Sequence, residues 1–511
     1  MKVRNIKKTI WLSYLIVSVL TVSSVAFTIV VPRTANAKEF PVSNVTELIN
    51  AINAVNDETT NPGLDTIILG AFGTYALNVA VDLNDGHNGL PSITSELTIN
   101  GNGATINRSS SAASSFRIFH VASGGNLILK DLTVRNGKTR FGDSITLRGF
   151  GGGILNNAGR LKLINCTVIG NKAPTVGNGG GISNEKGTVE LINSTISGNV
   201  ADWGGGVYNS GTMKLINCTV SHNHAVGVPV PCIGGGRSAG FGGGIVAIGG
   251  SVELTNCTIS SNKADFGSGC SGPGNPVGGI DIRGGKVITR NTIVAKQLKG
   301  TDCGNNFITS KGYNLDSDGT CGFTGDGDLQ NTDPQLEKFL NVVLTTGRGH
   351  FPLQKNSPAI DAGNNAFCPI NDQLHMPRPL QGKENSTVIC DIGAIEYYPI
   401  VDKDMVDLEA LDYFFSTTPV PPYATAGTLN ITATFRNTSG KTILHPFFEV
   451  IKFSHGVVLN TVGGSVGATL TPYVGSDGEF SDNESITVKF IIGLEKIQFL
   501  RFFVYLRGGI Y

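Results

Sequence analysis

Charged residues are scarce in this sequence of 511 residues, and neither sign is in excess. Asp, Glu, Lys and Arg make up 15% of the chain, with 39 acidic and 39 basic residues. A balanced charge produces no long-range field that would attract nucleic acid or an anionic membrane. We therefore expect no nucleic-acid partner.

Long apolar runs are also missing, except near the N-terminus. Four basic residues precede an uncharged, mostly apolar run at 10–31, and the small-residue site Ala35-Asn36-Ala37 follows it. This pattern predicts a signal peptide over 1–37 that is cleaved before Lys38. Because the run is longer than a usual signal core, a retained membrane anchor is the alternative. In both cases the rest of the chain is expected to be exported, to the extracellular space or a cell surface, including an outer membrane. No transmembrane span is expected in the mature chain.

Glycine, in contrast, is abundant, with 68 residues, and runs of it mark a repeat. Residues 179–223 contain nearly the same unit twice in succession, GGGISNEKGTVELINSTISGNVADWGGGVYNSGTMKLINCTVSHN. Each unit has a glycine run, an apolar residue, an Asn, an alternating stretch and an Asn-x-Thr. Units differ in length at one place only, just before the glycine run. A fixed core with insertions at one corner predicts a solenoid with loops on one side.

The apolar residues within each unit alternate, which is the period of a β-strand and not of a helix. Leu161 and Leu163 are expected to point inward and Lys162 outward. Three short strands cannot form a compact sheet alone, but units stacked in register share one interior. The sequence therefore predicts a parallel β-helix over 38–300, with rungs about 4.8 Å apart.

Stacking would also align polar side chains along the coil. Outward charges alternate in sign from unit to unit, and each adjacent pair should contribute about 0.2–1 kcal/mol. Asparagines recur at two bends, where their amides are expected to bond from rung to rung. The charges are Lys162, Glu190, Lys214 and Glu253, and the asparagines are Asn165, Asn193, Asn217 and Asn256 at one bend and Asn171, Asn199, Asn223 and Asn262 at the other.

Two groups of motifs resemble known families. GGGISN with STISGNVA, and GGGVYN with CTVSHNHA, are similar to the right-handed pectin-lyase-like β-helix, especially to the repeats of bacterial polymorphic outer-membrane proteins. SKGYNLDSDGTCGF, NTDPQL, NSPAIDAG and CDIGAIEY resemble the choice-of-anchor Q domain of exported bacterial proteins. The resemblance implies that 301–398 is the C-terminal part of the β-helix. The family's Asp-Gln-Arg-Gly is here Asp372-Gln373-Leu374-His375, and no sorting motif follows it.

Both ends of a solenoid need caps, because end rungs expose apolar interior and unpaired strand edges. Asn44 and Glu47 resemble a capping box, and apolar residues at helical spacing follow, so a helix over 44–56 is predicted. Residues 399–511 lack glycine repeats and alternate in short runs, which predicts an immunoglobulin-like β-sandwich. The predicted fold class is all-β, a right-handed parallel β-helix with an N-terminal helical cap and a small C-terminal antiparallel β-sandwich.

Cysteine is present in an odd number, nine, so at least one is unpaired within the chain. Export permits disulfides. Cys166, Cys218 and Cys257 share one inward repeat position and are expected to be free core thiols. The other six are predicted to form three bridges, each worth about 3 kcal/mol in the chain-entropy model. These are Cys232–Cys270, Cys303–Cys321 and Cys368–Cys390.

Catalysis on this fold would need carboxylates that converge, about 5–9.5 Å apart in a glycoside hydrolase. A calcium-dependent lyase would need acidic ligands and a basic residue on one sheet face. The residues expected to face outward on the glycine-led sheet include a single carboxylate; they are Leu155, Ser183, Tyr208, Val246 and Asp281. The leading interpretation therefore has no catalytic residue. The alternative is a polysaccharide lyase or glycoside hydrolase that uses Asp202, Asp265 and Asp281.

Two further sets of residues suggest binding. Asp316 and Asp318 are spaced like the start of a calcium loop, but a plain turn is favoured because Gly327 occupies the twelfth position. Trp203, Tyr208 and Phe241 near the glycine corner are candidates for stacking on sugars, and scattered surface aromatics are the alternative. We expect an exported, non-catalytic, adhesin-like protein that contacts a polysaccharide or a cell-surface glycan. Apart from calcium no cofactor is suggested, and the oligomeric state stays open.

Overall fold

The computed structural model describes residues 37–139, 149–227, 240–265, 276–304, 308–340, 349–380, 382–383, 387–421, 424–461, 468–498 and 500–510. Residues 36–511 form one compact unit. The predicted signal peptide falls almost entirely outside the described residues. In the described ranges the fold is all-β apart from one helix and one 3-10 turn: a parallel β-helix, followed by small antiparallel sheets.

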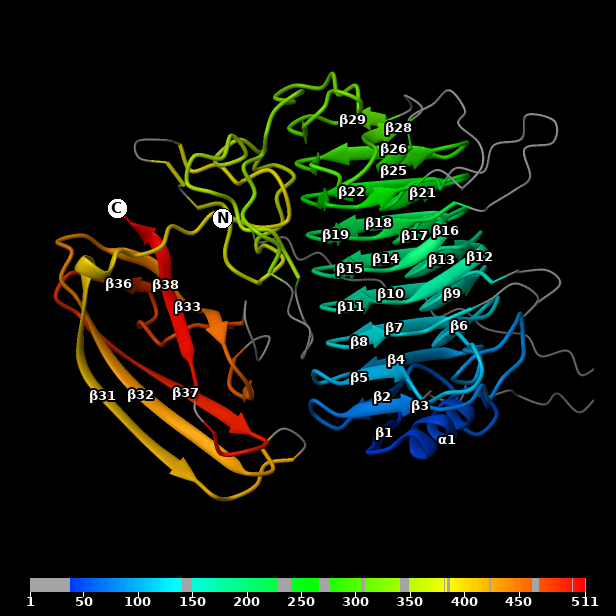
Figure 1. The fold of residues 1–511 in the computed structure, drawn as a ribbon, viewed down its shortest axis with the longest axis horizontal. Helices are drawn as coiled ribbons and strands as arrows, with labels where there is room; N and C mark the ends of the chain where they lie inside the picture. Colours follow the sequence, from blue (N-terminus) through cyan, green and yellow to red (C-terminus); the bar gives the residue numbers. More distant parts are fainter. Residues whose placement is uncertain are drawn as a thin grey trace, which may run out of the picture. The chain divides into compact units, whose positions relative to one another are not determined.

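The β-helix runs from residue 39 to residue 316 and is drawn as stacked rungs from blue to green in Figure 1. Four parallel sheets build it, with 10, 9, 7 and 4 strands, and the rungs from β6 onward contribute to the three larger ones. The long-strand sheet contains β1 (Glu39–Val42), β2 (Asp65–Leu69), β4 (Glu96–Asn100), β7 (Asn126–Lys130), β10 (Arg160–Ile164), β14 (Thr188–Ile192), β18 (Thr212–Ile216), β22 (Ser251–Thr255), β26 (Lys286–Arg290) and β29 (Ile308–Ser310).

The other two long sheets supply the further strands of the rungs. The threonine sheet contains β3 (Thr74–Leu77), β5 (Thr105–Arg108), β8 (Thr133–Arg135), β11 (Thr167–Ile169), β15 (Thr195–Ser197), β19 (Thr219–Ser221), β23 (Thr258–Ser260), β27 (Ile293–Ala295) and β30 (Leu315–Asp316). The glycine-led sheet contains β6 (Phe119–Val121), β9 (Ile154–Asn157), β13 (Ile182–Glu185), β17 (Val207–Asn209), β21 (Ile245–Ala247), β25 (Val277–Ile282) and β28 (Thr301–Gly304).

A fourth sheet was not predicted. It lies between the threonine and glycine-led sheets and consists of β12 (Lys172–Asn178), β16 (Val200–Trp203), β20 (His224–Ala225) and β24 (Lys263–Ala264). Its strands follow the second Asn bend, where the sequence varies in length, so no alternation could be read there. The glycine run after it forms a close corner. A Cβ on Gly180 would lie 2.5 Å from the carbonyl oxygens of Gly205 and Val200, so a side chain does not fit.

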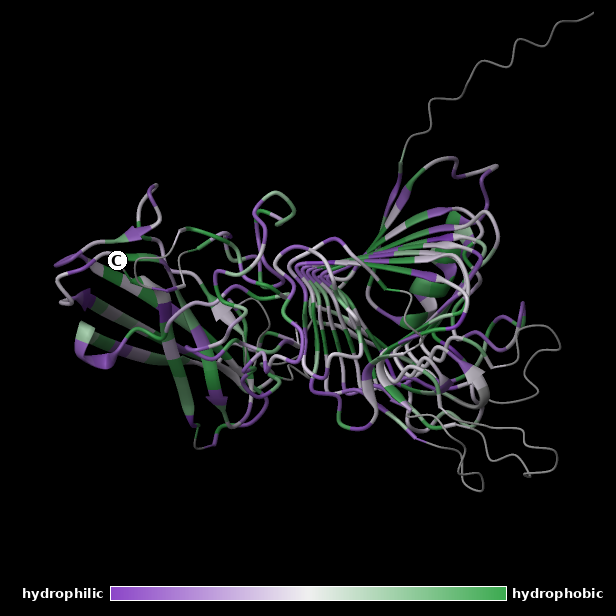
Figure 2. Ribbon diagram, turned by 90° about the horizontal axis from the view of Figure 1, so that it is seen from above, coloured by the Kyte–Doolittle hydropathy of each residue, from purple (hydrophilic) through white to green (hydrophobic). Residues whose placement is uncertain are grey.

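The predicted registers of the coil are confirmed. Leu161 and Leu163 are buried, while Lys162 points outward and its Nζ lies 2.7 Å from Glu190 Oε2. Figure 2, viewed along the coil, shows hydrophobic residues recurring at the same place in successive rungs. Cys166, Cys218 and Cys257 are free and buried in this interior, as expected.

Both asparagine bends are observed, but the predicted amide ladder is continuous only at the second. At the first, Asn217 Nδ2 donates to Asn193 Oδ1 at 3.1 Å, whereas the buried Oδ1 atoms of Asn165 and Asn217 have no hydrogen-bond partner among the described residues. At the second bend each side-chain Nδ2 donates to the amide oxygen of the next rung, at 3.0 Å from Asn171 to Asn199, from Asn199 to Asn223 and from Asn223 to Asn262. Gln297 continues this ladder beyond Asn262. At the first bend the asparagines adopt positive φ, between 48° and 55°. Asparagine tolerates this left-handed conformation better than most residues.

The N-terminal cap is the helix α1 (Val45–Val55), close to the predicted range. Asn44 Oδ1 accepts from Glu47 N at 3.0 Å, and Glu47 Oε2 accepts from Ser43 N at 2.7 Å. The reciprocal bond therefore goes to the residue before the N-cap. Leu48, Ile52 and Val55 are fully buried and close the interior of the first rung.

Residues 349–398, which we name the strap, return along the threonine sheet. Among the described residues between 317 and 402 there is no helix or strand. Gln373 spans two rungs: its Nε2 donates to Thr195 Oγ1 at 2.9 Å, and its Oε1 accepts from Thr219 Oγ1 at 2.6 Å. Ala394 N donates to Thr258 Oγ1 at 3.1 Å. The side chains of Thr195, Thr219 and Thr258 are therefore buried under the strap.

Two of the predicted disulfides are confirmed, Cys303–Cys321 and Cys368–Cys390. The first closes a loop after β28 and the second joins two parts of the strap. The predicted Cys232–Cys270 bridge lies outside the described residues.

The C-terminal region forms two antiparallel sheets. After a 3-10 turn at Lys403–Met405, one sheet contains β31 (Val406–Ser416), β32 (Gly427–Asn437), β37 (Ser485–Leu494) and β34 (Val457–Val458). The other contains β35 (Thr469–Leu470), β33 (Ile443–Phe453), β36 (Glu479–Phe480) and β38 (Phe502–Ile510). Phe448, Phe480 and Phe490 are buried in their shared core. This confirms the predicted β-sandwich.

Candidate functional site

Asp265, one of the three carboxylates of the catalytic alternative, lies between the side chains of a histidine and a lysine. Its Oδ2 is 2.5 Å from His224 Nε2, and its Oδ1 is 2.7 Å from Lys299 Nζ. Stacking produces this arrangement, because His224 pairs with Lys263 in the fourth sheet, and Lys263 pairs with Lys299 in the next rung. Burial raises the pKa of Asp265, but hydrogen bonds from Lys299 and His224 outweigh it and hold the pKa below its ordinary value. Burial lowers the pKa of His224.

Asp281 is fully buried in the glycine-led sheet and has a cation of its own. Arg283 Nε lies 3.0 Å from its Oδ2. The Arg283 guanidinium also lies 3.3 Å from the centroid of the Phe241 ring, a cation–π contact. Trp203 meets the same Phe241 ring edge-on, with centroids 5.1 Å apart. One face of the Phe241 ring is therefore occupied by the protein's own arginine.

Asp202 completes the set and is 2% exposed, within β16. Asp265 and Asp281 are thus held by different cations, and Asp202 is largely withdrawn from solvent. In the part of the chain that the structure describes, no group of three or more His, Cys, Asp or Glu side chains is placed to hold a metal ion.

The outward face of the glycine-led sheet has the predicted register but not the predicted exposure. Leu155, Ser183, Tyr208, Val246 and Asp281 do stack in consecutive strands. Tyr208, however, is 5% exposed, and its ring centroid lies 5.8 Å from that of Phe150. The expectation that Tyr208 stacks on a sugar is therefore wrong. Of the three predicted aromatics, Trp203 and Phe241 are half-buried.

Aromatic residues placed just before the glycine runs cover this face. Phe150 and Phe241 occupy that position and contact Tyr208 and Arg283, respectively. The signal was present in the sequence, because a large aromatic side chain directly before a close corner can only lie over one of the adjoining sheets. Sequence reasoning proposed Phe241 for stacking on sugars and gave Phe150 no role, so it missed their packing against the sheet.

Asp316 and Asp318 act as acceptors in a turn. Asp316 accepts from Cys321 N at 3.0 Å and from Asn331 N at 3.2 Å. Asp318 accepts from Thr320 N and from Asp302 N, both at 3.0 Å. Each of the four carboxylate oxygens is thus engaged by a backbone N–H, which favours the plain turn over a calcium loop. These residues are unsuited to hold a metal in this geometry.

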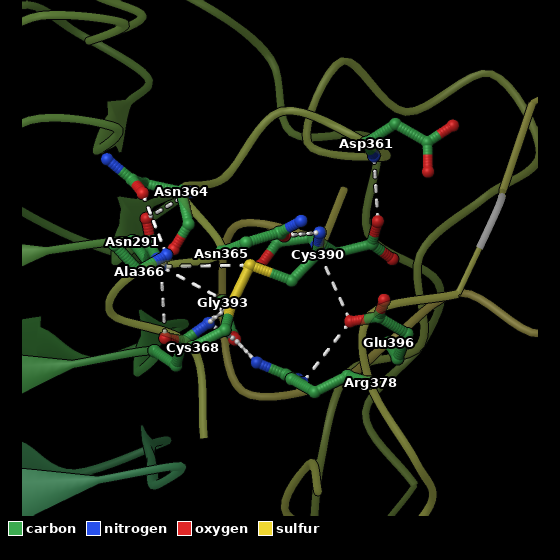
Figure 3. Close-up of a disulfide and its surroundings, with 12 residues drawn as sticks. Asn291, Asp361, Asn364, Asn365, Ala366, Cys368, Arg378, Cys390, Gly393 and Glu396 are labelled. Carbon is green, nitrogen blue, oxygen red and sulfur yellow. Dashed lines mark hydrogen bonds and ion pairs between the residues drawn. A yellow bond between two sulfur atoms is a disulfide. The ribbon is translucent and has the colours of Figure 1, made fainter. Parts of the chain in front are cut away.

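The strap contains a buried ionic cluster that Figure 3 shows beside the Cys368–Cys390 disulfide. Arg378 Nε lies 3.2 Å from Glu396 Oε2, and neither side chain is exposed. Glu396 also accepts from Leu380 N at 2.8 Å and Asp391 N at 3.2 Å. Burial raises the pKa of Glu396 to about 7, although Arg378 opposes the shift. The cluster ties loops of the strap together, since Arg378 and Glu396 come from separate parts of it.

A small cavity adjoins this cluster. It measures about 20 Å³, room for about one water molecule, and is lined by His350, Asp372, Glu396, Tyr398, Phe447 and Arg507 among others. Its size excludes a sugar or a nucleotide, so the buried acids here have a structural role.

Sequence reasoning also missed a serine–histidine–aspartate set in the first rungs. His120 Nδ1 lies 2.6 Å from Ser92 Oγ, and His120 Nε2 lies 3.3 Å from Asp85 Oδ2. Ser92 Oγ contacts Asp82 as well, and Ser92 is 6% exposed. Burial first, and then the charge of Arg117, lower the pKa of His120 to about 4. A hydroxyl so enclosed is poorly placed to attack a substrate, and only the folded rungs bring these separated residues together.

Comparisons with known proteins assign neither a family nor an activity to this chain. No family model matches the chain, and no curated protein matches it. A solved structure described as pectate lyase Pel9A is similar to this chain, with 12% sequence identity and a TM-score of 0.34. The match covers 71% of this chain and 98% of that one. None of the described helices is long and apolar enough to cross a membrane.

Proposed function

We propose that this is an exported, non-catalytic protein of the cell surface or extracellular space, whose β-helix presents a contact surface for a polysaccharide or a cell-surface glycan. The similarity of its motifs to polymorphic outer-membrane protein repeats and to the choice-of-anchor Q domain supports export. The predicted signal peptide and the two disulfides are consistent with an oxidising compartment.

One observation carries the non-catalytic part of the proposal. The carboxylates that a lyase or hydrolase would use are already engaged, Asp265 by His224 and Lys299 and Asp281 by Arg283. A glycosidase general acid needs a raised pKa, whereas the pKa of Asp265 is lowered. The half-buried ring of Trp203 and the exposed Lys299 lie on the loop side of the coil, and they are the contact residues we favour.

The test uses purified 38–511 and a panel of uronic-acid and neutral polysaccharides. We expect no release of unsaturated or reducing ends, and retention on at least one immobilised polysaccharide that Trp203→Ala weakens several-fold. Tyr473→Ala, an exposed aromatic of the C-terminal region, serves as the matched control and should bind normally. Depolymerisation that disappears on Asp265→Ala or Asp281→Ala would refute the proposal.

A polysaccharide lyase or glycoside hydrolase is the second candidate, and the His224–Asp265 contact favours it. A neutral histidine beside an ionised aspartate is the usual arrangement of a general base. His224→Gln separates the two functions, because it would abolish depolymerisation by a lyase but should leave polysaccharide retention nearly unchanged in a non-catalytic protein.

A further inference from the structure

Asp65, the first residue of β2, is a carboxylate that has no cationic partner among the described residues. The residue is fully buried. Its Oδ1 accepts a hydrogen bond of 2.8 Å from the backbone nitrogen of Lys38. Its Oδ2 is buried and has no hydrogen-bond partner among the described residues. Removing a carboxylate from water without a charged partner is costly, so this position calls for a cationic donor.

Lys38 is fixed in place by several contacts. Its backbone oxygen accepts from Thr66 N at 2.8 Å, which starts the pairing of β1 with β2. Its Nζ donates to Asn61 Oδ1 and to the Thr60 oxygen, so the side-chain ammonium is directed away from Asp65. Asn61 in turn donates to Ala54 O at the end of α1. The Lys38 nitrogen is therefore held beside the carboxylate by the N-terminal cap itself.

The bond that forms this nitrogen is the one that the small-residue site predicts to be cut. Hydrolysis by a signal peptidase adds water across the Ala37–Lys38 peptide bond. The carbonyl carbon of Ala37 gains a hydroxyl and leaves as a carboxylate, and the Lys38 nitrogen takes up protons to become an ammonium. An amide nitrogen carries one hydrogen and no charge, whereas the ammonium carries three hydrogens and a positive charge.

We propose that the mature chain begins at Lys38 and that its α-ammonium group forms an ion pair with the buried carboxylate of Asp65, so that removal of the leader completes the N-terminal cap. Charge-assisted hydrogen bonds of this kind are about twice as strong as neutral ones. In the uncleaved chain the Lys38 nitrogen is an uncharged amide, so it gives this carboxylate a weaker hydrogen bond and the cap is less stable before cleavage than after it. The inference goes beyond the proposed function and does not depend on whether the coil binds or cleaves glycans.

The test compares two purified chains that differ only at the N-terminus. One is 38–511 with Lys38 as its first residue, released from a fusion by a protease that leaves no extra residue. The other carries a Gly-Ser-Gly-Ser extension, which turns the Lys38 nitrogen into an amide and moves the ammonium away. Hydrogen exchange of 39–42 and 65–69 should be about 10- to 100-fold slower in the first chain. Equal exchange in the two chains would overturn the proposal.

Asp65→Asn, made in both chains, should change the hydrogen-exchange rate in opposite directions. A general loss of stability would instead speed exchange in both. It should speed exchange in the chain that begins at Lys38, where it removes one partner of an ion pair. It should slow exchange, or leave it unchanged, in the extended chain, where it removes an uncompensated charge. The same direction in both chains contradicts the ion pair. If the variant fails to fold, the comparison of the two chains that keep Asp65, one beginning at Lys38 and one extended, still tests the ion pair.

Two controls complete the experiment. Glu39→Gln changes an exposed carboxylate one residue further on, and it should leave the difference between the two chains as it was. The N-terminal sequence of the protein recovered from an exporting cell should begin at Lys38, and any other first residue refutes the cleavage part. None of these measurements uses a polysaccharide, so their failure is distinguishable from failure of the proposed function.

Discussion

The coil and the strap both bury backbone polar groups, but different acceptors satisfy them. In the coil, each strand bonds to the same strand of the neighbouring rungs, and amide ladders serve the bends. In the strap, side-chain carboxylates accept the hydrogen bonds of the backbone N–H groups. Asp372 accepts from three backbone N–H groups, those of Leu374, Met376 and Glu396, at 2.8–3.1 Å. A repeating segment can distribute its bonds over many equal contacts, whereas an irregular one depends on a few side chains.

This difference predicts that a single substitution lowers the free energy of unfolding more in the strap than in the coil. Arg378→Met should lower the free energy of unfolding by about 3–5 kcal/mol, because it leaves Glu396 and Asp391 buried without their cation. Arg160→Met on the coil, where the arginine is exposed, should cost less than about 0.5 kcal/mol. Urea unfolding of the purified chain measures both. Equal costs would mean that the strap does not rely on its charge cluster.

Loss of the strap's disulfide should be the next largest effect. Replacing Cys368 and Cys390 together by Ser should cost about 3 kcal/mol, because the unfolded chain regains the freedom of the closed loop. Replacing the core thiol Cys218 by Ala should have a smaller effect of about 1 kcal/mol, since it removes only one sulfur. Thermal unfolding under non-reducing conditions checks the order, and a reversed order would contradict the bridge in solution.

A break in the amide ladder should matter less, because neighbouring rungs remain paired. Asn199→Ala removes the acceptor of Asn171 Nδ2 and the donor to Asn223 Oδ1, at about 1–3 kcal/mol. Thr188→Ala, an exposed position of β14, is the control and should be nearly neutral. Hydrogen exchange should rise in the rungs on both sides of Asn199. Exchange confined to one rung would argue against a continuous ladder.

Acidification should change the stability around two buried groups, Glu396 and His120, in opposite directions, by on the order of 1–3 kcal/mol each. Burial raises the pKa of Glu396 from 4.5 to about 7, so its contribution to stability is full below pH 4.5 and is lost as the pH rises through 7. Burial lowers the pKa of His120 from 6.5 to about 4, so its contribution is present above pH 6.5 and is lost as the pH falls through 4.

Hydrogen exchange at pH 7.5 and pH 5, corrected for the intrinsic rate, tests this pair of shifts. Residues around Glu396 should become better protected at pH 5, and those around His120 less protected. Glu396→Gln should remove the first change and leave the second. A change of the same sign at both ends would show that other groups govern the pH dependence.

Local pattern was sufficient for the coil and failed for the strap. The alternation at Leu161–Leu163 and the recurring Asn residues are short-range signals, and both predict the observed rungs. Gln373 and Thr195 meet across 178 residues, and nothing near either residue announces the contact. The same limit applied to the catalytic alternative, since only folding reveals that Asp265 and Asp281 are each matched with a cation. Tyr208 was placed on the right face, but its covering ring was not foreseen.

The ladder from Asn171 to Gln297 has a consequence for how this protein can change in length. Each amide fits only the one above and below it, so a deletion of a few residues within a rung would put every later bend out of phase. Removal of one whole unit, such as 182–206, instead brings equivalent bends together again. The height of the coil therefore changes in whole turns. Variants with one turn more or fewer should retain the same cross-section. Their strap, however, would no longer match the number of rungs beneath it.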